Sequence, residues 1–204
     1  MNKFKLNIGQ LIQGKLNLRK VNIAFVFQVN CPGCFIYGFP TMNILYEQFK
    51  DSVGFAGIST AFEDFEHNTE ENTERLLSKG ITVGETKKYL TANKIDSYLH
   101  LPSFPIAFDK MSTAKDFLTD ENLSNLMNLL TKSTPLSMVE QEKIQQRIRH
   151  YYSNHPVIAE TFTLNQLRGT PSFIIYKENY EIIQASFGHQ SEQVLSEILQ
   201  KNLF

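Results

Sequence analysis

Two cysteines, Cys31 and Cys34, have the residue type and spacing for chemistry, and this 204-residue chain holds no other cysteine. Their Cys-Pro-Gly-Cys motif suits three arrangements: an exchangeable disulfide, half of a zinc site, or a redox pair that opens a helix. An apolar run over 21–27 precedes the motif, and a stretch with helical spacing over 35–50 follows it. A strand, this motif and a helix in that order indicate a reactive dithiol.

The two thiols are expected to have different roles. A cysteine attacks a disulfide as the thiolate, and a free cysteine with a pKa near ~8.5 is mostly protonated at neutral pH. The unpaired N–H groups and the dipole at a helix N-terminus stabilise an anion, so Cys31 is expected to be the nucleophile. Cys34 lies one turn further along the same face and is expected to resolve the mixed disulfide. Pro32 suits the first helical turn, and Gly33 leaves the sulfur of Cys31 open to a bulky protein substrate.

The strands that must position this pair are visible as short apolar runs. The apolar run 21–27 suits a strand buried on both faces of a sheet, and the run 53–60, rich in small and β-branched residues, suits a second parallel strand. The later runs 172–176 and 181–185, joined by four residues, suit a hairpin. Weak alternation near the start suits an edge hairpin. The predicted strand regions are 1–20 (hairpin), 21–27, 53–60, 104–109, and the pair 172–176 and 181–185.

The predicted helices separate these strands. Apolar spacing of three and four residues predicts helices at 35–50, 69–79, 83–93 and from about 191 to the end. Pro40 is expected to kink or locally break the first of them. Thr82 and Glu85 resemble a capping box for the third, and Ser191 is a good N-cap for the last. The order of elements predicts an α/β fold with a central mixed sheet flanked by helices.

The segment 112–157 has a different pattern. Two polar stretches with helical apolar spacing, 117–130 and 138–152, are separated by Pro135. We interpret them as an inserted α-helical hairpin within a single domain of residues 1–204. Two interpretations of this insertion stay open: it packs beside the sheet, or it forms a lobe with a function of its own.

Composition and charge exclude several classes of function. The net charge is −1, from 20 basic and 21 acidic residues, and no basic stripe points to a nucleic-acid partner. No run of apolar residues is long enough for a transmembrane helix, so no membrane partner is expected. No signal peptide is visible, so we expect a cytoplasmic protein, with the periplasm as the alternative if a leader had been removed.

A second motif completes a family resemblance. The Cys31-Pro-x-Cys34 motif after a core strand, with Gly-Thr-Pro-Ser at 169–172 before a late strand, resembles the thioredoxin superfamily. This resemblance implies a thioredoxin-like fold in which Pro171 is a cis-proline facing the disulfide. It also implies that Thr170 offers its backbone N–H and C=O to an extended substrate chain. Taken alone, a proline before a strand is also compatible with an ordinary strand start.

Within that superfamily, the segments 57–64 and 104–109 resemble TlpA-like and redoxin-type proteins, and 167–171 with the helical insertion is similar to DsbA-type oxidases. The resemblance covers about residues 20–110 and 158–200. The insertion itself matches no named family.

Three positions depart from the family pattern. Asn30 stands where a tryptophan usually precedes the first cysteine, and Phe25 stands where thioredoxin has a buried acid. Pro40 falls one residue later than the helix proline usual in TlpA-like proteins. Without a carboxylate at position 25, proton transfer from Cys34 is expected to need another group or water.

The sequence favours a thiol–disulfide oxidoreductase that reduces or exchanges disulfides in protein substrates. Such a protein needs an external thiol donor or redox partner, and no cofactor or metal is expected. The acidic cluster Glu63, Asp64 and Glu66 could raise the pKa of Cys31 but better suits a solvated loop. Tyr37 could neighbour the sulfurs but better suits the core.

Three alternatives stay open. A peroxiredoxin-like thiol peroxidase normally has Pro-x-x-x-Thr-x-x-Cys, which the residues before Cys31 do not provide. A structural zinc site needs four ligands, and only His150 and His155 have a suitable histidine spacing, on a polar helical segment. A non-catalytic thioredoxin-fold binding module would leave Cys31 with an ordinary thiol pKa.

Overall fold

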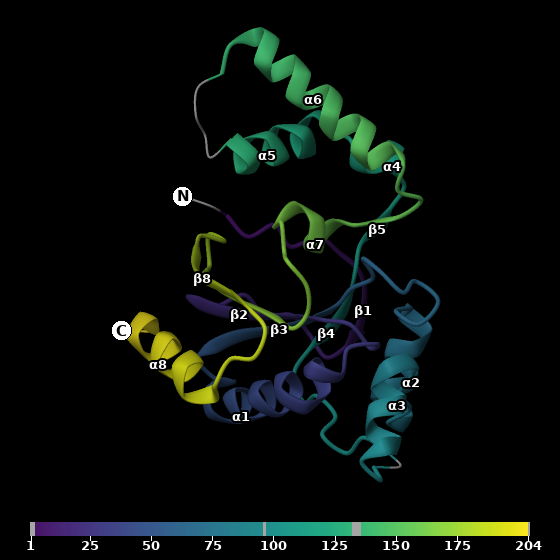
Figure 1. The fold of residues 1–204 in the computed structure, drawn as a ribbon. Coiled ribbons are helices and arrows are strands. Elements are labelled where there is room, and N and C mark those ends of the chain that lie inside the picture. Colours follow the sequence, from purple (N-terminus) through teal and green to yellow (C-terminus); the bar gives the residue numbers. More distant parts are fainter. Residues whose placement is uncertain (1–2, 96, 132–135, 204) are drawn as a thin grey trace.

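The computed structural model describes residues 3–95, 97–131 and 136–203 and contains a six-stranded sheet with the order β1-β4-β3-β2-β7-β8 (Figure 1). β2, β3 and β4 run parallel, while β1, β7 and β8 each pair antiparallel with a neighbour. The predicted mixed sheet is therefore confirmed. The strands are β1 (Ile8–Gln13), β2 (Val21–Phe27), β3 (Val53–Ser59), β4 (Ile106–Asp109), β7 (Ser172–Lys177) and β8 (Ile182–Phe187).

Helices cover both faces of this sheet. The π-helix η1, the helix α1 and the last helix α8 lie against one face, and the short helix α7 lies against the other (Figure 1). α2 and α3 follow β3 in the chain and lie at the side of the sheet. These helices are η1 (Cys34–Gly38), α1 (Phe39–Phe49), α2 (Glu70–Lys79), α3 (Gly84–Ala92), α7 (Glu160–Leu164) and α8 (Glu192–Leu203).

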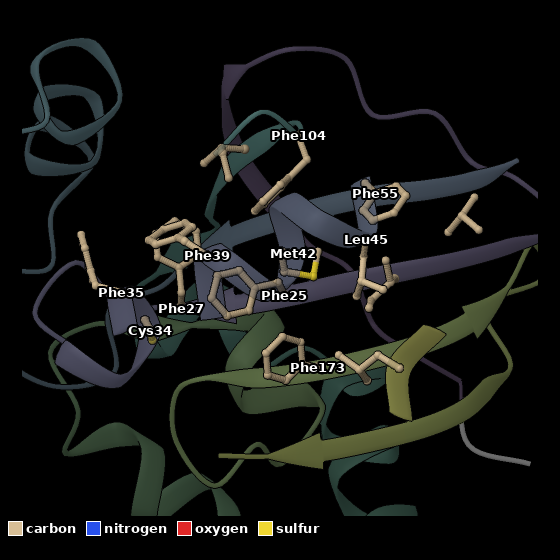
Figure 2. Packing of buried hydrophobic residues seen from close by; sticks show 14 of the residues in the cluster. Phe25, Phe27, Cys34, Phe35, Phe39, Met42, Leu45, Phe55, Phe104 and Phe173 are labelled. Atoms are coloured by element: carbon tan, nitrogen blue, oxygen red, sulfur yellow. The ribbon is translucent and has the colours of Figure 1, made fainter. Parts of the chain in front are cut away.

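Side chains of β2 alternate between the two faces because successive residues of a strand point in opposite directions. Phe25 and Phe27 point towards α1, while Ala24 and Val26 belong to the cluster on the α7 face. Phe25 is fully buried, and its ring stacks on those of Phe27 and Phe173 at centroid distances of 5.4 and 5.2 Å (Figure 2). The abundant phenylalanines thus form the core beneath the cysteines.

The segment after β4 forms a small helical lobe above the α7 face (Figure 1). A short ribbon of β5 (Met111–Ser112) and β6 (Ile158–Ala159) joins it to the sheet. Its helices are α4 (Ala114–Phe117), α5 (Asp120–Thr131) and α6 (Met138–Ser153), and they bury a separate cluster that includes Phe117 and Leu126. The two predicted helical stretches are present, and Pro135 lies outside the described residues.

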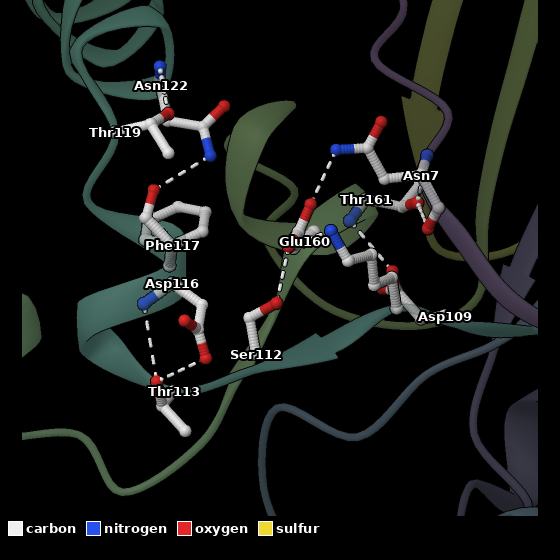
Figure 3. A network of polar contacts seen from close by, with 11 residues as sticks. Asn7, Asp109, Ser112, Thr113, Asp116, Phe117, Thr119, Asn122, Glu160 and Thr161 are labelled. Atoms are coloured by element: carbon white, nitrogen blue, oxygen red, sulfur yellow. Dashed lines mark hydrogen bonds and ion pairs between the residues drawn. The ribbon is translucent and has the colours of Figure 1, made fainter.

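Two buried carboxylates hold the lobe to the sheet (Figure 3). The Asp109 carboxylate, at the end of β4, accepts the N–H groups of Thr161 and Phe162 at 2.8 and 3.1 Å, which caps α7. Glu160 is 2% exposed, forms an ion pair with Lys110 at 3.0 Å and accepts hydrogen bonds from side chains of β5 and the N-terminal segment. Because all of these bonds are internal, the junction is a fixed part of the fold.

Two predicted details differ in the structure. The predicted hairpin within 1–20 is wrong: among residues 3–20 only β1 is a strand, and it pairs with β4 at the sheet edge. The predicted capping box at Thr82 is also wrong, because Val83 is the N-cap of α3 and supplies no side-chain bond. The predicted local break near Pro40 is confirmed: Pro40 is the second residue of α1, and the π-helix η1 precedes it, with the Phe39 N–H donating to the Cys34 carbonyl.

Other predicted details are confirmed. Ser191 caps α8, since its Oγ accepts the N–H of Val194 at 3.3 Å. Across the described ranges, no helix is both long and apolar enough to cross a membrane. The cytoplasmic location stays a prediction.

Candidate redox site

The two cysteines lie together where β2 leads into η1. The Sγ atoms of Cys31 and Cys34 are 2.7 Å apart, and both thiols are free. Cys31 is half-buried, whereas Cys34 is fully buried against the phenylalanine core (Figure 2). Cys31 is therefore the more accessible of the two cysteines, and Cys34 is shielded from solvent.

Hydrogen bonds from the start of the helix stabilise the thiolate of Cys31. Its Sγ accepts the backbone N–H of Cys34 at 3.3 Å as well as the Cys34 thiol. The hydrogen bond from the Cys34 thiol is the largest cause that lowers the pKa of Cys31 to about 7, although burial opposes it. Hydrogen bonds from the backbone of Cys34 and Gly33 lower this pKa further. Cys31 is thus more readily ionised at neutral pH than an ordinary cysteine.

The pKa of Cys34 is shifted in the opposite direction. Burial raises the pKa of the Cys34 thiol well above its ordinary value, and the adjacent Cys31 raises it further. The fully buried Phe25 occupies the β2 position where the family pattern has an acid. The pair therefore combines a reactive thiolate with a protonated thiol that donates to it.

The Thr170–Pro171 peptide bond is cis, and it lies directly opposite the cysteines. The Cys31 thiol lies 3.5 Å from the Thr170 carbonyl oxygen. Pro171 lies near the cysteine loop, since a Cβ added at Gly33 would lie 3.7 Å from its Cδ. The structure thus brings together the six residues predicted from the two motifs: Cys31, Pro32, Gly33, Cys34, Thr170 and Pro171.

Sequence reasoning missed a buried amide at the centre of this site. Gln28, 2% exposed, follows β2 and accepts the Thr170 hydroxyl at 3.2 Å through Oε1. Its Nε2 donates to the Glu63 carbonyl at 3.4 Å. The signal in the sequence was a polar residue, Gln28, directly after the apolar run 21–27, since a polar group that becomes buried needs an internal partner.

Two weaker predictions have clear outcomes. The acidic cluster Glu63, Asp64 and Glu66 is exposed to solvent, and none of these residues is among the main causes of the Cys31 pKa. Core packing of Tyr37 is wrong: this side chain is 46% exposed and packs on His189 with ring centroids 4.5 Å apart. Tyr37 therefore belongs to the surface beside the cysteines.

A metal site finds no support in the arrangement of the described residues. Within the ranges 3–95, 97–131 and 136–203, no group of three or more His, Cys, Asp and Glu side chains is placed to hold a metal ion. His150 is exposed on α6, and the ring of His155 packs against that of Tyr151 with the centroids 4.6 Å apart.

Comparison with known proteins rests on structure alone, because no family pattern and no curated protein matches this sequence. A thiol-disulfide isomerase from Corynebacterium glutamicum is 21% identical, with coverage of 99% of this chain and 96% of that chain and a TM-score of 0.59. A thioredoxin-like superfamily protein is 20% identical, with coverage of 98% and 96% and a TM-score of 0.58. Both similarities extend over nearly the full length of each chain. The chain therefore has the thioredoxin-like fold.

Proposed function

We propose that this protein is a thiol–disulfide oxidoreductase that reduces or exchanges disulfides in protein substrates. The observation that carries the proposal is the contact between the half-buried Cys31 and the buried Cys34, whose Sγ atoms are 2.7 Å apart. The cis peptide bond before Pro171 supports the proposal, in which the backbone of Thr170 binds an extended substrate chain beside the cysteines. We also propose that residues 1–204 form one domain with 112–157 as an insertion.

The proposed reaction has two exchange steps. The Cys31 thiolate attacks one sulfur of a substrate disulfide, which forms a mixed disulfide and releases the other substrate sulfur as a thiolate. Cys34 then loses its proton and attacks Cys31 Sγ, which releases the second substrate sulfur. The substrate gains two electrons, and its two released thiolates take up the Cys34 proton and one proton from water, while the protein is left with a Cys31–Cys34 disulfide. An external thiol donor reduces this disulfide by the same exchange in reverse.

The proton of Cys34 needs an acceptor in the second step. Phe25 is apolar, so the β2 position beneath the cysteines supplies no base. The substrate thiolate released in the first step is an acceptor that the reaction itself generates, and water at the half-buried Cys31 side is another. We therefore expect the resolving step to be slower than the first attack.

The pKa of Cys31 separates this function from a binding module with a vestigial dithiol. A binding module leaves Cys31 with an ordinary thiol pKa, whereas hydrogen bonds in this site lower it to about 7. The TlpA-like affiliation is part of this proposal. The direction of electron flow depends on the reduction potential of the pair.

Reduction of insulin with dithiothreitol as the donor tests the proposal. The wild-type protein should accelerate the precipitation of reduced insulin, and Cys31→Ser should not accelerate it at all. Hydrogen peroxide consumption under the same conditions should stay at the background rate. Unchanged insulin reduction in Cys31→Ser would refute the proposal, and peroxide consumption that depends on Cys31 would replace it with a thiol peroxidase.

A further inference from the structure

The residue before the nucleophile, Asn30, joins the cysteine loop to two distant segments. Its backbone N–H donates to Oδ1 of Asn68 at 2.9 Å. Its side-chain Nδ2 donates to an Asp64 carboxylate oxygen at 2.8 Å, and its Oδ1 accepts the N–H of Glu85 at 2.6 Å. One asparagine thus holds the 63–68 loop and the start of α3 against the cysteines.

The partner of the Asn30 backbone is itself fixed. Asn68 is 2% exposed, and its Nδ2 donates to the Glu63 carbonyl at 2.9 Å. The same carbonyl accepts Nε2 of Gln28. A buried amide with both ends bonded cannot rotate freely, so it constrains the backbone directly before Cys31.

The start of α3 is shaped to receive the Asn30 side chain. Gly84 has a φ of +50°, and a Cβ added there would lie 2.0 Å from Oδ1 of Asn30. The N-cap Val83 offers no side-chain bond, so Asn30 satisfies one of the N–H groups that a helix leaves unpaired at its start. Gly84 leaves room for the Asn30 side chain, and the hydrogen bond from the Glu85 N–H to Asn30 gives α3 the cap that Val83 does not supply.

We propose that Asn30 is a positioning residue for the redox pair, which holds Cys31 in place through its bonds to Asn68, Asp64 and Glu85. The inference rests on the proposed thiol–disulfide exchange. Cys31 Sγ accepts donors that lie in the first turn after it, so the sulfur keeps these bonds only while the backbone before it stays fixed. Asn30 supplies that restraint where thioredoxins have a tryptophan.

The charged groups around Asn30 are few. Asp64 bonds to its amide, Glu85 contributes a backbone N–H, and His67 lies close to Gly84. Cys34 is the titratable group in contact with Cys31 itself. An effect of Asn30 could therefore be positional or could arise from the charge of Asp64, and the experiment has to separate the two.

The test is the pH dependence of iodoacetamide alkylation at Cys31, followed by mass spectrometry of the full-length protein. Asn30→Ala should move the midpoint of the profile upward and slow alkylation at pH 7 by about threefold to tenfold, because a smaller fraction of Cys31 is thiolate. At pH 9.5 the wild-type and variant rates should agree. Gly84→Ala should shift the midpoint in the same direction, because its methyl group would displace Oδ1 of Asn30.

Two control variants make the test specific. Asn43 also bonds to backbone groups of another segment, through the Ser103 N–H and the Leu101 carbonyl, so Asn43→Ala should reduce stability without moving the Cys31 midpoint. Asp64→Asn removes the charge but keeps an oxygen for Asn30, and it should also leave the midpoint in place. A midpoint that moves in Asp64→Asn would assign the effect to charge and overturn the positioning role.

The failure of this inference and that of the proposed function are distinguishable. If the wild-type protein reduces insulin and Asn30→Ala keeps the wild-type midpoint, the positioning role is refuted and the exchange function stands. If the wild-type protein does not reduce insulin, the exchange function itself is refuted. Equal midpoint shifts in Asn30→Ala and Asn43→Ala would also refute the role, because they would indicate a general loss of rigidity.

Discussion

The Thr170 hydroxyl donates a hydrogen bond of 3.2 Å to Oε1 of Gln28, which joins the loop before β7 to the end of β2. Gln28 is buried and also bonds to the Glu63 carbonyl. Three segments around Cys31 thus meet at one amide. Because buried polar groups are costly when unpaired, this amide should contribute to stability as well as to the shape of the site.

Removal of the Thr170 hydroxyl tests this link. Thr170→Val leaves Oε1 of Gln28 buried without its donor, so we expect a loss of about 1–3 kcal/mol in the free energy of unfolding. Thr170→Ser keeps the hydroxyl and serves as the matched control, with little change. Urea denaturation of the reduced proteins measures both. Equal stability of the two variants would show that the bond to Gln28 contributes nothing.

The alkylation rate of Cys31 should depend on pH near neutrality. Because hydrogen bonds lower the pKa of Cys31 to about 7, its alkylation rate should rise through pH 7 and level off above about pH 8. Cys34→Ala removes the largest of these donors, so its midpoint should lie higher. Stopped-flow or mass-spectrometric alkylation at Cys31 measures the profile. A wild-type midpoint in the range of a free thiol would contradict these hydrogen bonds to the thiolate.

Two glycines near the cysteines should respond differently to a methyl group. A Cβ added at Gly38 would lie 2.4 Å from the Phe25 ring, whereas one at Gly33 would meet Pro171 only at an ordinary contact distance of 3.7 Å. Overpacking typically costs about 1–3 kcal/mol, so Gly38→Ala should lose that amount and Gly33→Ala very little. Thermal or urea unfolding compares them. The loss in Gly38→Ala should shrink when Phe25→Leu is added, and a loss that persists would assign it to the backbone.

Asp109 predicts a pH-dependent contribution to stability. Burial raises the pKa of this carboxyl from 3.8 to about 6, against the hydrogen bonds that lower it. The folded state then binds the proton more tightly than the unfolded state, so the contribution is full below about pH 4 and is lost as the pH rises through 6. The shift corresponds to about 2–3 kcal/mol.

The measurement for Asp109 is urea unfolding at several pH values between 4 and 7. The stability of the wild type minus that of Asp109→Asn should fall across this range, because the variant lacks the titrating group. A difference that stays constant or increases with pH would contradict a raised pKa at Asp109.

Features of the fold and of the redox site could be predicted from the sequence where they depend on residues close together in the chain. The cysteine motif, the buried run that became β2 and the Gly-Thr-Pro-Ser motif before β7 are all local patterns, and the structure brings them together. The mixed character of the sheet followed from the alternation of apolar runs with helical stretches and from the hairpin near the end of the chain.

Contacts between distant segments were not predictable. Asn30 bonds to residues 38 and 55 positions away, and a single sequence gives no indication of such pairings. Asp109 ends a strand, and only the packing of α7 on that strand shows why a carboxylate is buried there. The weak alternation in 1–20 could not reveal that β1 would pair with β4 rather than with a strand of its own hairpin.

Trapping the mixed disulfide tests the proposed exchange most directly. Cys34→Ser protein is mixed with oxidised insulin and its intact mass is measured after an acid quench, with Cys31→Ser as the control. A covalent adduct at Cys31 should accumulate in Cys34→Ser, be absent in Cys31→Ser and be released by dithiothreitol. The absence of an adduct in Cys34→Ser, or an equal adduct in Cys31→Ser, would contradict nucleophilic attack by Cys31.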